Sequence, residues 1–344
     1  MGFEALNLGH EISPQMSIDD QLLLSGLDWS VDASPLVSEF NGRLFKDDDV
    51  SVLRRSDTGE RLTIVGDRWK PYSNRRFLTD FNNFCDRSGY IVERAGFIKR
   101  KAGLNKEAMA FASAVVPGSH DGELDLGNGD RSQMRIIFLN YFTYGKAIGG
   151  FVVNERIFCQ NQLVLKVKDG TKQTIRHTAN NVEGYDSILR VKGTLENVQK
   201  SIRNFWHISE CLTRQIVTQR EAVDFFIKHF GDIEKPVHKQ PFAVQSMIDI
   251  YFDNMRLDNP NVDLAMNIET TKDTAYGVLN AVTAYETHCQ GWNPQTGKAN
   301  IGGSDRFLRS VASNSKSQIA FNSLARKYVI PSQNNQTIQT VGAF

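Results

Sequence analysis

The stretch IVGDRWKPYSNRRF, residues 64–77, places basic side chains among aromatic rings. Guanidinium and ammonium groups pair with phosphates, and exposed rings stack on bases. The mixture is therefore typical of proteins that bind single-stranded nucleic acid without sequence preference. For Phe77 we expect core packing instead. The candidates for nucleic-acid binding in this stretch are Arg68, Trp69, Lys70, Tyr72, Arg75 and Arg76.

Two of these cations occupy an unfavourable place. Ser73 and Asn74 are both residue types that cap a helix, which puts Arg75 and Arg76 in the first turn of that helix. The helix dipole disfavours cations there, whereas anions bind readily at a helix N-terminus. The placement therefore predicts a phosphate partner at this turn.

Further cations recur along the chain. Lys99, Arg100 and Lys101 fall at an expected hairpin turn, where their side chains must be exposed. Four basic residues of the last expected helix fall within roughly one quarter of the helix circumference, because successive residues are rotated by about 100° around the helix axis. Each cluster alone is typical of a solvated surface, but together they predict a groove for a phosphate backbone. To this groove we also assign Lys99, Arg100, Lys101, Arg306, Arg309 and Lys316.

The loop HDGELDLGNGD, residues 120–130, collects oxygen ligands that suit a divalent cation. The spacing matches neither an EF-hand nor a two-metal nuclease site, and long hairpin loops accumulate Asp, Gly and Asn in any case. A turn is the favoured interpretation, with a metal-dependent nuclease or hydrolase as the alternative. Its weak ligand candidates are Asp121, Glu123, Asp125 and Asp130.

We assign no catalytic residue and expect no cofactor. The chain contains no phosphate loop, dinucleotide fingerprint, HExxH or GxSxG motif. Cys159 and His177 are residue types that make a nucleophilic pair, yet Cys159 falls on the apolar side of an expected helix, where a buried thiol is inert. We therefore expect a binding protein rather than an enzyme.

Composition narrows the class of protein further. The 344 residues are 40% hydrophobic and 23% charged, which is ordinary for a globular chain, and no apolar run is long enough to span a membrane. The four cysteines are far apart and the N-terminus lacks a signal-peptide pattern, so we expect a cytoplasmic protein with reduced thiols. Residues 1–50 are strongly acidic and no acid follows Asp305, a distribution that favours head-to-tail association or shielding of a basic surface.

The hydrophobic pattern predicts an α+β fold: an antiparallel β-meander sheet with packed helices, followed by a mainly α-helical C-terminal region. We expect an acidic N-terminal arm over residues 1–50, with a short helix that begins after Ser17. An α+β core domain follows over 51–192, then a helical region over 193–330 and a mobile tail over 331–344. The first expected strand begins at residue 61 and ends at Gly66, and a turn over 67–71 follows it. Further strands are expected at 90–98, 107–117, 133–142 and 147–154, and helices at 77–89, 155–167, 195–230, 243–255, 274–289 and 305–328.

Several blocks resemble the phage/plasmid-like family known as domain of unknown function 932, in register from about residue 40 to 325. The blocks are SVLRRSDTGERLTIVGDRWKPYSNRRFLTDF, GELDLGNGD, NERIFCQNQL, IRHT and AYGVLNAVTAYETH with GSDRFLR. Arg156, Cys159, Gln160 and Asn161 match the family's Arg-x-x-Cys-Gln-Asn, and Trp69 stands where the family has Tyr. The resemblance implies a phage, prophage or plasmid origin near replication or recombination genes, and it implies no activity.

The leading hypothesis is a phage- or plasmid-type protein, in an infected or plasmid-bearing bacterial cell, that binds single-stranded DNA and assembles into a homo-oligomer that anneals or protects strands. A strand meander with basic hairpins is also the general layout of phage single-strand-annealing proteins, although this likeness is one of fold alone. The alternatives are the metal-dependent nuclease and a structural or host-directed interaction protein without catalysis, whose helical half binds another protein. Phage or host replication and recombination proteins are the candidate protein partners. The choice between DNA and RNA stays open.

Overall fold

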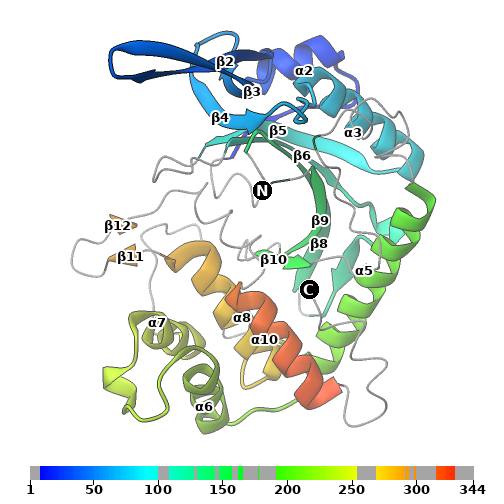
Figure 1. The fold of residues 1–344 in the computed structure, drawn as a ribbon. Helices are drawn as coiled ribbons and strands as arrows, with labels where there is room; N and C mark the ends of the chain where they lie inside the picture. The colour runs from blue at the N-terminus through cyan, green and yellow to red at the C-terminus, as the bar shows by residue number, and fades with distance from the viewer. Residues whose placement is uncertain are drawn as a thin grey trace.

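The computed structural model describes residues 8–99, 108–127, 130–143, 146, 148–156, 162–165, 177, 191–253, 269–290, 292–293, 298–299 and 315–329. Antiparallel sheets form the N-terminal half and helices dominate the C-terminal part, so the predicted α+β fold is confirmed. In Figure 1 the larger sheet curves, with α3 and α5 along its outer side and the remaining C-terminal helices gathered at one end. No helix of the described residues is both long and apolar enough to cross a membrane.

The larger sheet has seven antiparallel strands in the order β1-β5-β6-β8-β9-β10, with β7 paired to β8. Strand β8 is buried over almost its whole length because both of its faces are covered. The strands are β1 (His10–Glu11), β5 (Ile91–Lys99), β6 (Ala108–Val115), β7 (Glu123–Asp125), β8 (Arg131–Tyr141), β9 (Gly149–Arg156) and β10 (Gln162–Leu165).

Alternation along β8 separates two apolar clusters. Ile136 and Phe138 point to the larger core, where the rings of Phe81 and Phe84 from α3 pack on Phe138 with centroids 5.3 and 5.2 Å away. Ile137 points to the opposite face and a smaller cluster that includes Leu8, Met109, Phe111, Leu139 and Val153. The two-residue period of a strand thus places one set of side chains on each face.

Helix α3 (Asn74–Ser88) forms where the sequence predicts it. The Ser73 hydroxyl accepts a hydrogen bond from the Arg76 amide at its start, and Gly89 ends it with a φ of 68°, a left-handed conformation that suits glycine. Between these caps, Phe77, Phe81 and Phe84 recur at helical spacing and are fully buried.

A second sheet is built from β2 (Val31–Phe40), β3 (Arg43–Arg55) and β4 (Arg61–Gly66), in that order. The β2–β3 hairpin closes through Asn41 and Gly42, whose φ values of 53° and 75° are typical of a two-residue hairpin turn. The predicted domain boundary at residue 50 falls inside β3. Helix α2 (Ile18–Leu24) begins after the cap Ser17 as predicted, and Trp29 is buried in the main core, so the acidic segment belongs to the folded unit.

The helix predicted over 155–167 is wrong. Strand β9 continues to Arg156, and β10 pairs back on it antiparallel, with Gln162 opposite Glu155 and Leu165 opposite Val152. Residues 157–161 lie outside the described part of the chain. Apolar positions in this segment have a helix-like spacing, and the pairing of β10 with β9 overrode that local pattern.

The C-terminal helices follow the remaining predictions in outline. The predicted stripe over 195–230 divides into α5 (Val191–Thr213) and α6 (Gln219–Phe230), and a capping box between Thr218 and Glu221 begins the second helix. Residues 305–314 and the predicted tail 331–344 lie outside the described residues. The other elements are η1 (Gly118–His120), η2 (Val237–Lys239), α7 (Phe242–Tyr251), α8 (Ala275–Ala284), the π-helical turn η3 (Tyr285–Cys289), β11 (Trp292–Asn293), β12 (Lys298–Ala299), α10 (Lys316–Leu324) and the π-helical turn η4 (Ala325–Val329).

Candidate nucleic-acid interface

The turn at residues 66–71, which follows β4, is fixed by a contact with a distant residue. The Trp69 ring stacks on the His177 ring, with 4.6 Å between the centroids and 18° between the planes. The Lys70 amide donates a hydrogen bond to the His177 carbonyl at 2.9 Å, and His177 Nδ1 lies 3.1 Å from the Lys70 carbonyl oxygen. Because this carbonyl can only accept, Nδ1 carries the proton. Two hydrogen bonds, one from the Lys70 amide and one from the His177 side chain, together with one ring stack, therefore hold the turn in place.

His177 is only 4% exposed. Burial lowers its pKa to about 4, against the opposing effect of the Lys70 and Tyr141 backbone carbonyls. The ring is therefore neutral at pH 7. A neutral ring is the form that stacks on Trp69 without placing an uncompensated charge in the protein interior.

Residues of two predicted basic clusters lie at the same end of the larger sheet. His177 contacts the backbone of Tyr141, the last residue of β8, and Tyr141 pairs with Met109 of β6. Lys99 ends β5 opposite Ala108, the residue before Met109. Lys70 and the backbone of Lys99 therefore lie at the same end of the sheet. Arg100 and Lys101 follow Lys99 but lie outside the described residues.

Lys146 also lies at this end. Its Nζ is 5.9 Å from the centre of the Tyr141 ring, and its side chain is exposed. The sequence patterns did not single it out, because Lys146 stands alone in a glycine-rich segment. Only the strand register, which places the end of β8 and the end of β5 on either side of the start of β6, puts Lys146 at the same end of the sheet as the backbone of Lys99.

Arg68 and Lys70 are exposed, and within the part of the chain that the structure describes neither forms an ion pair. They stand on either side of Trp69, which is half-buried against the main core and covered by His177 on one ring face. An exposed cation without an acid partner attracts anions more strongly than a paired one. These two residues therefore carry the predicted basic character of the turn.

The prediction that Tyr72 is available for base stacking is wrong. Tyr72 is only 1% exposed, and its hydroxyl donates a hydrogen bond to the Asp80 carboxylate. The Asn140 side chain donates to the Tyr72 carbonyl at 2.8 Å. Burial and the Asp80 carboxylate together raise the pKa of the phenol. Tyr72 anchors the start of α3 to the sheet and presents no ring to solvent.

The argument for a phosphate at the first turn of α3 also fails. Arg75 forms an ion pair with Asp19 of α2, and Arg76 lies 3.6 Å from Asp80 one helical turn later. The Arg76 guanidinium is also 5.4 Å from the centre of the Tyr72 ring. The chain itself supplies the anions that offset two cations at a helix N-terminus.

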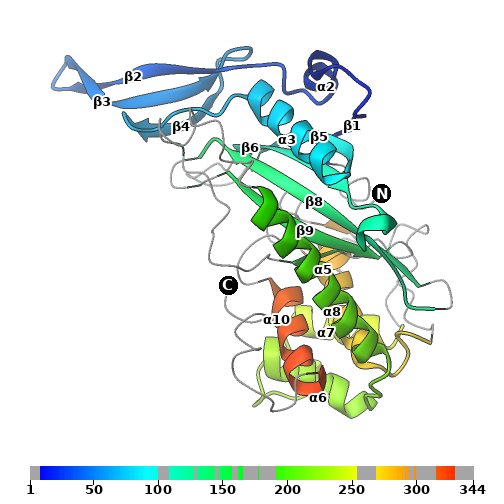
Figure 2. The same cartoon turned by 90° about the vertical axis from the view of Figure 1, so that its right-hand side faces the viewer.

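The last helix does not join this interface. Lys316 begins α10, and its Nζ lies 5.1 Å from the centre of the Phe230 ring at the end of α6. In both views α10 lies among the C-terminal helices, whereas β4 and the turn after it lie beside α3 at the other side of the sheet (Figures 1 and 2). Arg306 and Arg309 lie outside the described residues.

The four carboxylates proposed as metal ligands do not converge. Asp121 pairs with Arg203 at 2.7 Å, Glu123 with Arg131 at 3.3 Å, and Asp125 accepts a hydrogen bond from the Gly127 amide at 2.8 Å. Within the described ranges no three His, Cys, Asp or Glu side chains are grouped so as to hold a metal ion. Cys159, which we expected to be a buried inert thiol, lies outside those ranges.

Asp130 serves a structural role that the sequence patterns missed. It is completely buried and accepts hydrogen bonds from Arg156 Nε at 2.5 Å, Arg156 Nη2 at 2.8 Å and the Thr270 hydroxyl at 2.5 Å. The Arg156 guanidinium also lies 5.7 Å from the centre of the Tyr276 ring. A buried bidentate pair of this kind joins the loop before β8, the end of β9 and the segment before α8.

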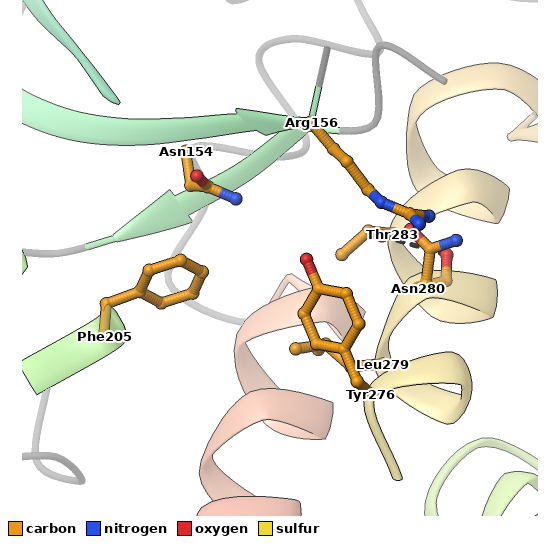
Figure 3. A pocket seen from close by; sticks show the side chains of 7 residues that line it. All are labelled: Asn154, Arg156, Phe205, Tyr276, Leu279, Asn280 and Thr283. Carbon is orange, nitrogen blue, oxygen red and sulfur yellow. Dashed lines mark hydrogen bonds between the residues drawn. The ribbon is translucent and has the colours of Figure 1, made fainter. Parts of the chain in front are cut away.

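A small cavity adjoins this ion pair (Figure 3). Its volume of about 20 Å³ is enough for one water molecule. The lining side chains come from β9, α5 and α8, and they are Asn154, Arg156, Phe205, Tyr276, Leu279, Asn280 and Thr283. The volume excludes a nucleotide-sized ligand from this space.

The fold and the site together define an α+β protein in which a basic turn is held at one end of a curved antiparallel sheet. Residues 61–320 match the family model described as Domain of unknown function (DUF932), and the chain belongs to this family. Comparison with curated proteins and with solved structures finds no match. The family blocks that carried the resemblance are those that meet in space: the Trp69 block contacts His177, and Asp130 pairs with Arg156.

Proposed function

We propose that the chain binds single-stranded DNA without strong sequence preference, as a DNA-associated protein of phage or plasmid type. The observation that carries the proposal is the pair of exposed cations, Arg68 and Lys70, on a turn that His177 holds in place. The phage or plasmid association rests on the family resemblance. Strand annealing by a homo-oligomer is part of the same proposal.

The proposed mechanism is electrostatic capture by a preorganised turn. Because the turn is already fixed, pairing Arg68 and Lys70 with phosphates costs little additional backbone order. Lys146, exposed at the same end of the sheet, extends the path that a phosphate backbone would follow. A base would stack on the Trp69 ring face away from His177, and stacking of this kind tolerates any base.

Fluorescence anisotropy of a labelled oligothymidylate tests the proposal directly. For contacts to about three phosphates, the affinity should fall by roughly 20-fold between about 50 and 200 mM salt, because single-strand binding releases condensed counterions. A duplex and an RNA of the same length serve as competitors. Absence of binding at about 50 mM salt, or an affinity that does not change with salt, would overturn the proposal.

The same reactions test annealing and the nuclease alternative. Faster formation of duplex from complementary strands would support annealing, and a rate equal to that without protein would remove that part of the proposal. Addition of Mg²⁺ or Mn²⁺ should leave the oligonucleotide intact, because the loop carboxylates are paired with Arg203, Arg131 and Arg156. Cleavage that Asp121→Ala abolishes would favour the nuclease instead.

A further inference from the structure

The β2–β3 hairpin projects from the body of the protein as a two-stranded ribbon (Figures 1 and 2). Its outer part exposes large apolar side chains, with Phe40 67% and Leu44 74% exposed. The register pairs Ser38 with Phe45 and Glu39 with Leu44, which puts Phe40 and Phe45 on one face and Leu44 on the other, together with Val37. Exposed apolar side chains that cluster in this way mark an interaction site. We call these four residues the ribbon tip.

The charge of the ribbon selects the chemistry of its partner. Residues 31–50 carry five acids and only two bases, Arg43 and Lys46. Lys46 is paired with Asp48 at 2.9 Å, which leaves the ribbon acidic. A surface of this charge repels nucleic acid and anionic lipid. The ribbon tip therefore fits an apolar surface with a basic border.

This chain carries such a surface at its other end. Between α6 and α7, Ile233 is 76% exposed, and Val237 and Phe242 are also exposed. We call these three residues the helical patch. Lys228 and Lys239 are exposed along the same segment, together with the acid Glu234, and Lys235 is paired with Asp232 at 3.0 Å. Lys316 contacts the Phe230 ring where α6 ends, so Lys228, Lys239 and Lys316 supply the basic border. The ribbon and the α6–α7 segment lie at opposite ends of the protein in both views (Figures 1 and 2).

We propose that the ribbon tip of one copy docks on the helical patch of a second copy. The charges complement each other across this contact, whereas a symmetric contact between two ribbons would bring Asp47, Asp48 and Asp49 of each copy together. Because the two surfaces lie at opposite ends, the ribbon tip of a chain cannot contact the helical patch of the same chain. Copies therefore add head to tail, which closes into a ring or continues as a filament. This proposal does not depend on nucleic-acid binding.

Sedimentation velocity without nucleic acid tests the contact. The average mass of the wild-type protein should rise above that of one chain as its concentration increases to about 100 µM, which saturates a micromolar contact. The double variants Phe40→Ser/Leu44→Ser and Ile233→Ser/Val237→Ser should each stay monomeric. Leu23→Ser is the matched control, because Leu23 on α2 is 71% exposed and lies outside both surfaces. Thermal melting followed by circular dichroism confirms that each variant folds.

A mixing experiment separates head-to-tail docking from other contacts. The ribbon variant keeps an intact helical patch and the patch variant keeps an intact ribbon. An equimolar mixture should therefore form one contact and sediment as a dimer, although each variant alone is a monomer. A patch variant that still dimerises would show that ribbons pair with each other and would overturn the proposal. A wild-type protein that stays monomeric throughout the titration would overturn it as well.

Discussion

Trp69 stacks on His177 across 4.6 Å, and this contact ties the turn after β4 to the end of the larger sheet. The turn has few local features that would fix its conformation, since only the Trp69 amide closes it by donating to the Gly66 carbonyl at 3.1 Å. The Asp67 amide donates to the Asp49 carbonyl on β3 at 3.1 Å, and the distant histidine supplies two further hydrogen bonds and the ring stack. The positions of Arg68 and Lys70 therefore depend on whether His177 stays neutral and buried.

The stability of the protein should depend on pH through His177. Its folded-state pKa of about 4 lies below the ordinary 6.5, so between these values the unfolded chain binds the proton more readily. The contribution is fully present above pH 6.5 and is lost as the pH falls through 4, with a total on the order of 3 kcal/mol. Chemical denaturation between pH 7 and pH 4 measures it.

The control for this prediction is His177→Asn, which cannot titrate in this range. The variant is less stable at pH 7, because it loses the stack on Trp69, but its free energy of unfolding should fall less steeply with acid than that of the wild type. All carboxylates are shared by both proteins, so their contributions cancel in the comparison. Parallel pH profiles would contradict a depressed His177 pKa.

Arg68→Ala/Lys70→Ala should weaken binding to oligothymidylate by roughly tenfold at low salt and reduce the slope of log affinity against log salt by about 1.4, because two phosphate contacts are lost. Arg214→Ala/Arg220→Ala removes the same charge from exposed positions around the start of α6 and should leave the slope unchanged. Anisotropy titrations at several salt concentrations give both slopes. An equal loss of DNA affinity in the two double variants would mean that net charge alone drives binding.

Asp67→Asn should strengthen the same binding. Asp67 is exposed in the turn, next to Arg68, and its amide donates to the Asp49 carbonyl at 3.1 Å. Its charge opposes the approach of phosphate, so removing it should raise the affinity by about two- to fivefold at low salt and by less at high salt. An unchanged affinity would place the bound strand away from this turn. Asp57→Asn, on the β3–β4 turn beside Arg55, is the control.

Tyr72→Phe should lower stability without changing DNA affinity, whereas Trp69→Ala should lower DNA affinity. Tyr72→Phe removes the hydrogen bond to Asp80 and should lower the free energy of unfolding by about 1–2 kcal/mol, with no change in DNA affinity because the ring is buried. Trp69→Ala removes the stack on His177 and should weaken binding. Urea unfolding and anisotropy measure the two effects. A loss of affinity in Tyr72→Phe greater than in Trp69→Ala would refute this assignment.

The buried Arg156–Asp130 pair should be a large single contribution to stability. Asp130→Asn leaves the Arg156 guanidinium buried without its carboxylate, which should cost about 3–5 kcal/mol. The double variant Asp130→Leu/Arg156→Met removes both charges and should be more stable than Asp130→Asn. Urea denaturation compares the three proteins. If Asp130→Asn instead unfolds at the wild-type urea concentration, the pair makes no net contribution.

Local patterns in the sequence determined most of the elements that position the site. The phenylalanine spacing and the Ser73 cap predicted α3, and the strand-like apolar run in residues 133–142 predicted β8. The turn after Gly66 was also predicted. These features depend on capping, periodicity and turn chemistry, which act between residues close together in the chain.

Tertiary structure alone decided which predicted residues are available to a partner. Tyr72 and Lys70 are two residues apart, yet one is buried beneath Asn140 and the other is exposed. Arg75 meets Asp19, and Asp130 meets Arg156, through contacts that no local pattern encodes. The positions of helices, strands and turns thus follow from interactions between residues that are close together in the chain. Burial and charge pairing depend on which distant strands and helices pack together. That packing decides whether a basic side chain stays exposed without an acid partner or is neutralised by one.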